Sequence, residues 1–131
     1  MATTRVLVID DDEIVRELMC ELLRVRDCEV FSTGSPIGVS KLIVHNRIDV
    51  VVLDVMMPDM SGDKLAKLLR GNPKFQQLAI VLVSSTQAEH LAGLADEVKA
   101  DAIVSKSVLR EELAMTAINA VRRRALSRTM S

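Results

Sequence analysis

The sequence has 131 residues, 49% of them hydrophobic, and a formal net charge of −1. This length suits one domain, and the composition excludes a disordered chain. A net charge near zero gives no general attraction to nucleic acids or membranes, and a chain without Trp or Tyr lacks the usual platform for stacking single-stranded bases. We therefore expect one domain over residues 1–131, with a core at about 5–124 and a tail at 125–131, and no membrane or nucleic-acid partner.

The cysteines and the N-terminus indicate the compartment. Cys20 and Cys28 lack the CxxC spacing of a zinc or redox site, so we expect both to be packing residues in a reducing compartment. The N-terminus lacks the charged and long apolar regions of a signal peptide, and no apolar run approaches about 18 residues. We expect a cytoplasmic protein.

Short apolar runs alternate with helical patterns from the start of the chain. Residues 5–9 (RVLVI) form a buried strand, and a helix follows with Asp12 as its N-cap. The predicted apolar face of this helix consists of Ile14, Val15, Leu18, Leu22 and Val25. Residues 28–32 form a second strand.

The second helix and the third strand follow a turn. Ser35 is suited to cap a helix over residues 37–45, with Pro36 at its first helical position. Residues 50–53 (VVVL) are too few for a helix of usual length and are rich in β-branched residues, which is typical of a strand buried on both faces. This strand stops at Asp54, so a carboxylate lies at its carboxyl end.

The second half of the chain repeats the alternation. A loop rich in helix breakers leads to a helix over residues 63–70, whose predicted inward residues are Leu65, Leu68 and Leu69. Residues 78–83 form a fourth strand, and a helix over 87–99 follows it. Residues 102–105 form a fifth strand, and residues 109–126 form the last helix.

Five β-α units with apolar strands predict an α/β fold, with a parallel sheet between two layers of helices. Because crossovers are right-handed, five strands favour the flavodoxin-like (βα)5 three-layer sandwich, with strand order 2-1-3-4-5. In this order the first, third, fourth and fifth strands are neighbours. Whatever follows these four strands therefore meets at one edge of the sheet.

Polar residues follow each of these four strands. They are Asp10 and Asp11, Asp54, Ser84 and Lys106. Three carboxylates at one place repel one another unless a cation lies between them, and oxygen ligands suit Mg²⁺ or Mn²⁺. A metal ion, a lysine and a hydroxyl group together can hold a phosphoryl group, and a carboxylate can accept one as an acyl phosphate.

This arrangement resembles the receiver domain of two-component response regulators, over about Arg5 to Arg124. The resemblance rests on VLVIDDD at residues 6–12, LDVMMPDMSG at 53–62, and Lys106 after the fifth strand. It implies that Asp54 is the phosphoacceptor. It implies metal ligands at Asp10, Asp11, Asp54 and the backbone carbonyl of Met56, with Asp10 acting through water. It further implies that Ser84 donates to a phosphate oxygen and that Lys106 pairs with the phosphate.

The resemblance also implies partners. The phosphoryl group would come from a sensor histidine kinase or a histidine phosphotransfer protein. The protein would catalyse only its own phosphorylation and dephosphorylation, and would change how the face of the fourth helix, fifth strand and fifth helix binds a downstream protein or effector domain. Two positions depart from the family pattern: Ser107 stands where proline is usual, and Ile103 where an aromatic residue is usual. The first departure leaves open whether the bond after Lys106 is cis, and the second leaves open how the signal is relayed.

Other readings predict different behaviour. An aspartate-nucleophile phosphatase of the haloacid dehalogenase type is one, because Asp10 and Asp12 resemble its opening motif, but that family needs an acidic pair where this chain has Ser84. A receiver-like interaction module that never carries phosphate is another. The basic stretch at 122–124 is interpreted as a solvated helix end. Neither the cognate kinase nor the oligomeric state follows from the sequence, which fits a stand-alone receiver or part of a longer protein.

Overall fold

The structure, a computed structural model, describes residues 3–58, 60–85 and 88–130. Its strands are β1 (Arg5–Ile9), β2 (Glu29–Thr33), β3 (Val50–Asp54), β4 (Ala79–Ser84) and β5 (Ala102–Ser105). Its α-helices are α1 (Glu13–Arg24), α2 (Val39–His45), α3 (Gly62–Gly71), α4 (Ala88–Val98) and α5 (Leu109–Met130). Two 3₁₀ turns, η1 (Pro73–Phe75) and η2 (Lys106–Val108), precede β4 and α5. Gln87, where the fourth helix was predicted to begin, lies outside the described residues.

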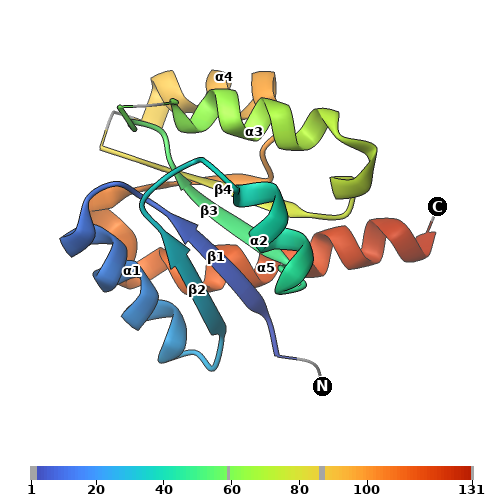
Figure 1. Cartoon of the computed structure of the whole chain (residues 1–131), viewed down its shortest axis with the longest axis horizontal. Helices are drawn as coiled ribbons and strands as arrows, with labels where there is room; N and C mark the ends of the chain where they lie inside the picture. The colour runs from blue at the N-terminus through green and yellow to red at the C-terminus, as the bar shows by residue number, and fades with distance from the viewer. Residues whose placement is uncertain (1–2, 59, 86–87, 131) are drawn as a thin grey trace.

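The strands form one parallel sheet in the predicted order, β2-β1-β3-β4-β5. Residues of α1 and α5 pack on one face, and residues of α2, α3 and α4 pack on the other (Figure 1). The central strands β3 and β4 are buried along their whole length because helices cover both of their faces. The flavodoxin-like three-layer sandwich is therefore confirmed, and the carboxyl ends of β1, β3, β4 and β5 meet at one edge. None of the described helices is long and apolar enough to cross a membrane.

The buried face of α1 differs from the predicted one. Its buried residues are Met19, Cys20 and Leu23. Ile14 and Val25, predicted to face inward, are 82% and 77% exposed. Ile14 lies in the first turn and Val25 is the C-cap, so both lie outside the central turns that pack on the sheet. The helical period predicted the element and the half-buried Val15, Leu18 and Leu22 correctly, but it did not identify the three fully buried residues.

The start of α2 was also predicted too early. The helix begins at Val39, because Gly38 has a φ of +79° and this left-handed conformation interrupts a helix. Ser35 Oγ accepts a hydrogen bond from the Ile37 N–H at 3.1 Å, so Ser35 caps a turn before the helix and not the helix itself. Ile37 is left 81% exposed, and Leu68 of α3, predicted to face inward, is 62% exposed.

Both cysteines pack in the core, as predicted. Cys20 and Cys28 are free and buried. Burial raises the pKa of both thiols, which keeps them in the unreactive protonated form.

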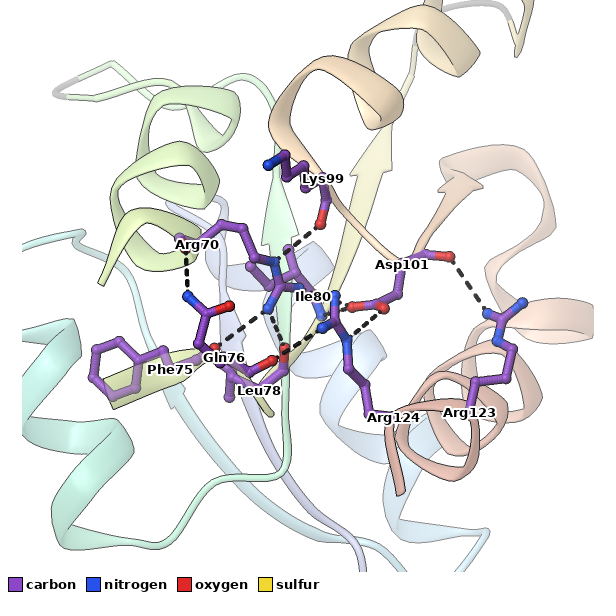
Figure 2. A network of polar contacts seen from close by, with 9 residues as sticks. All are labelled: Arg70, Phe75, Gln76, Leu78, Ile80, Lys99, Asp101, Arg123 and Arg124. Carbon is purple, nitrogen blue, oxygen red and sulfur yellow. Dashed lines mark hydrogen bonds and ion pairs between the residues drawn. The ribbon is translucent and has the colours of Figure 1, made fainter. Parts of the chain in front are cut away.

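The end of α5 differs from the predicted solvated helix end. The helix continues to Met130, and Arg124 in it binds Asp101, with Nε and Oδ1 2.8 Å apart. Arg70 of α3 binds the other oxygen of the same carboxylate at 3.0 Å (Figure 2). The Arg70 guanidinium also donates to the backbone carbonyls of Phe75, Leu78 and Lys99. This network joins α3, the residue before β5, and α5 at the amino-terminal edge of the sheet.

Candidate functional site

Asp54 ends β3 and is 2% exposed. The pairing of β3 with β4 continues one residue further, because the Val55 N–H donates to the Val83 carbonyl at 3.0 Å. The Met56 N–H donates to Asp54 Oδ1 at 3.2 Å. The chain then returns, and the Gly62 N–H donates to the Val55 carbonyl at 2.9 Å. These bonds fix the position of the Asp54 carboxylate at the carboxyl edge of the sheet.

The three acidic residues after β1 have different environments. Asp10 is fully buried, and its Oδ1 accepts a hydrogen bond from the Asp12 N–H at 2.9 Å. Asp11 is exposed. Asp12 accepts from the first backbone N–H groups of α1 and so caps this helix, as predicted. One carboxylate oxygen from each of Asp10, Asp11 and Asp54 lies within 4.8 Å of the other two.

This carboxylate cluster fits a divalent cation. Asp10 Oδ2 is buried and accepts no hydrogen bond within the part of the chain that the structure describes. Burial, with a further contribution from the charge of Asp54, raises the pKa of Asp10 to about 6. A cation bound among the three carboxylates would offset both the burial and the repulsion. Carboxylate oxygens are the ligands that Mg²⁺ and Mn²⁺ prefer.

Lys106 reaches the same cluster from the carboxyl end of β5. Its Nζ lies 3.4 Å from Asp54 Oδ1 and 3.8 Å from Asp10 Oδ2, with the side chain 25% exposed. The residue begins η2, which Ser105 caps by accepting a hydrogen bond from the Ser107 N–H at 3.3 Å. The bond between Lys106 and Ser107 is trans. Ser107 therefore donates through an N–H that a proline would lack. The contact between Ser105 and Ser107 was not predicted, although the Ser-x-Ser spacing could have indicated it.

The other predicted residues lie at or next to this edge. Ser84 ends β4, is fully buried, and is in register with Ser105 of β5. The Met56 side chain is 68% exposed, while its backbone lies two residues after Asp54. Ile103 is half-buried in β5, where it is in register with Leu82 and packs against the core. The fold thus brings Asp10, Asp11, Asp54, Ser84 and Lys106 to one edge of the sheet.

Two contributors to the site were not recognised from the sequence. A Cβ atom on Gly62 would lie 2.1 Å from the backbone carbonyl oxygen of Asp54, so only glycine permits the loop to pack this closely. Glycine after the breakers of this loop was a signal for such a close approach. Arg16 is the second, because its Nη1 donates to the Asp10 carbonyl oxygen at 2.8 Å. No sequence pattern indicates that contact.

Comparison with known proteins identifies a family. The family described as response regulator receiver domain matches residues 6–118. The response regulator MprA of Mycobacterium sp. (strain KMS) is 34% identical over 109 residues, which are 83% of this chain and 46% of that protein. MprA of Mycobacterium tuberculosis (strain ATCC 25618 / H37Rv) is 32% identical over 111 residues, which are 85% of this chain and 47% of that protein. The chain thus spans about half the length of these curated relatives.

Solved structures show the same fold. A response regulator receiver domain protein from Clostridium thermocellum superposes with a TM-score of 0.82 and 26% identity, over 94% of this chain and 98% of that chain. The chemotaxis protein CheY4 of Vibrio cholerae superposes with a TM-score of 0.76 and 21% identity, over 93% and 98% of the two chains. The family match covers most of the chain and the architecture agrees with it, so the chain belongs to the response regulator receiver domain family of two-component signalling.

Proposed function

We propose that the protein is a phosphorylation-dependent switch in which Asp54 accepts a phosphoryl group. The donor is a phosphohistidine of a sensor histidine kinase or of a histidine phosphotransfer protein. One observation carries the proposal: the oxygens of Asp10, Asp11 and Asp54 lie within 4.8 Å of one another, and the Lys106 ammonium lies 3.4 Å from Asp54. With a cation held among the carboxylates, such a set of groups suits a site that accepts a phosphoryl group.

The transfer requires little of the protein beyond positioning and charge. An Asp54 carboxylate oxygen attacks the phosphorus atom, and the new O–P bond forms as the N–P bond to the donor imidazole breaks. The other ring nitrogen of the donor carries a proton, so when the leaving nitrogen keeps the electron pair of that bond the donor becomes neutral imidazole, and the product is an aspartyl phosphate. Lys106 pairs with the phosphoryl oxygens, and the Ser84 hydroxyl donates to one of them.

The carboxylate cluster would hold a Mg²⁺ or Mn²⁺ ion. Asp11 and Asp54 would bind it directly, Asp10 through water, and Met56 through its backbone carbonyl. The ion supplies positive charge that offsets repulsion between the incoming phosphoryl group and the carboxylates. Asp10 Oδ2 supports this assignment: it accepts no hydrogen bond from the described residues, and a buried carboxylate oxygen without a hydrogen-bond donor is costly unless a cation or an ordered water satisfies it.

The chain lacks the aromatic residue that is usual at position 103 of this family, so the signal needs another route to a partner protein. We propose that phosphorylation changes the face formed by α4, β5 and α5, which then binds a downstream protein or an effector domain in a different way. Ile103 has no ring that could swing inward, and it already packs against the core. The signal therefore passes through Ser84, Lys106 and the backbone of β5.

A beryllofluoride titration tests this switch. Beryllofluoride with Mg²⁺ mimics an aspartyl phosphate, and ¹⁵N-labelled protein should show amide shifts both at the carboxylate cluster and along α4, β5 and α5. The matched control, Asp54→Asn, should show neither set. Shifts at the cluster alone would support phosphate capture without output, and no shifts at all would favour an interaction module that never carries phosphate.

A further inference from the structure

A groove runs along α2, from the face of the sheet that carries α3 to the amino-terminal edge of the sheet. Its first section, with a volume of about 500 Å³, lies between the start of α2 and α3. Ser40 and Lys41 also line a middle section of about 350 Å³ that reaches η1. Val44, Lys74 and Phe75 line both this middle section and a third section of about 350 Å³, which reaches α5. Neighbouring sections share lining residues, and we name the three together the α2 groove.

The α2 groove exposes apolar side chains that the core does not use. Ile37 is 81% exposed, Leu68 62% and Val44 52%, whereas Val39 and Ile43 of α2 are buried in the core. Single exposed apolar residues are ordinary, but three along one groove mark a surface on which another apolar group can pack. Spaced apolar contacts along a groove are the pattern by which an amphipathic helix binds.

The charges along the α2 groove have one dominant sign. Lys41, Arg47 and Lys74 are exposed along it, and among the described residues none of the three forms an ion pair. Asp49 lines the third section, and its Oδ2 accepts a hydrogen bond from the Arg5 N–H at 2.8 Å. The net charge of the chain is −1, so this positive charge is local to the groove. It complements a partner that carries acidic side chains.

We propose that the α2 groove is a docking surface for an acidic amphipathic helix of a partner protein. The apolar face of that helix packs on Ile37, Val44 and Leu68, and its flanking Asp or Glu side chains meet Lys41 and Lys74. The apolar contacts argue against a site for a small anion, and the concave shape argues against a flat membrane surface. This inference does not depend on phosphorylation of Asp54, and unphosphorylated protein suffices to test it.

Two synthetic helical peptides of about five turns, with a scrambled peptide as a control, test the proposal. Both carry Leu at i, i+3, i+4 and i+7, with Glu on the flanks of the apolar stripe in one and Lys in the other; a third peptide has the acidic composition in scrambled order. The first should shift the amide resonances of α2, of η1 and around Leu68 in ¹⁵N-labelled protein. The basic and scrambled peptides should bind at least about tenfold more weakly.

Charge-reversal variants distinguish binding in the α2 groove from a general electrostatic attraction between the protein and an acidic peptide. The double variant Lys41→Glu/Lys74→Glu should weaken binding of the acidic peptide by about tenfold or more, and Leu68→Ser should weaken it independently of salt. Arg110→Glu/Arg122→Glu, at exposed positions of α5 outside the groove, changes the net charge by the same amount and should leave binding unchanged. Equal binding of the three peptides, or shifts confined to other elements, overturns the proposal. So does a protein dimer that Leu68→Ser dissociates, because a second copy would then cover the groove.

Discussion

The buried carboxylate of Asp10 should make the metal-free protein less stable at neutral pH than it could be. The pKa of this group rises from 3.8 to about 6 on folding, chiefly because of burial. At about 1.4 kcal/mol per pKa unit, this corresponds to about 3 kcal/mol of unfolding free energy. The folded state binds the proton more tightly, so the cost is absent below pH 3.8, grows as the pH rises to 6, and is fully present above it.

The variant Asp10→Asn removes the charge but keeps an oxygen that can accept the Asp12 N–H. In EDTA at pH 7 we expect urea unfolding to show a gain of up to about 3 kcal/mol over the wild type, and at pH 3.5 we expect the gain to shrink toward zero. Asp96→Asn, at an exposed position of α4, is the control and should show no such pH-dependent gain. A gain that is the same at both pH values, or a loss at pH 7, would refute the electrostatic reasoning.

Three further predictions concern other parts of the fold. Asp11→Ala should raise the melting temperature without Mg²⁺ and remove the stabilisation that Mg²⁺ gives the wild type; a variant that still gains stability from Mg²⁺ contradicts the ligand assignment. Gly62→Ala places a Cβ 2.1 Å from the Asp54 carbonyl oxygen, so phosphorylation from acetyl phosphate should slow at least about tenfold, and an unchanged rate would show that the loop can yield. Asp101→Ala leaves the buried Arg70 without its carboxylate and should cost about 3 kcal/mol in urea unfolding, a loss that a value below about 1 kcal/mol would contradict.

The parallel sheet could be predicted because its signal is local and strong. Residues 50–53 and 78–83 are apolar runs with a carboxylate or hydroxyl at their ends, and burial on both faces leaves no other arrangement for them. The strand order then brings Asp54, Ser84 and Lys106 together without any further information. Most of the candidate site therefore follows from the order of elements and from the residue type at each strand end.

What could not be predicted depends on contacts between distant segments. The helical period placed Ile14 and Val25 inside, but the burial of helix ends depends on what lies beneath them. From the sequence Arg124 is one of several solvated arginines, but in the structure it donates to the carboxylate of Asp101, 23 positions away, and to the carbonyl of Gln76. The φ of +79° at Gly38, which delays α2, likewise follows from the path between β2 and α2 and not from propensity alone.

The most direct test of the central claim is the intact mass of the protein after incubation with acetyl phosphate and Mg²⁺. The account predicts an added mass of one phosphoryl group in the wild type, none in EDTA, and none in Asp54→Asn. The Asp54→Glu variant serves as a second control, because it keeps the charge but displaces the acceptor oxygen. A phosphoryl group that persists in Asp54→Asn, or a wild type that gains no mass with Mg²⁺ present, would contradict the assignment of Asp54 as the phosphoacceptor.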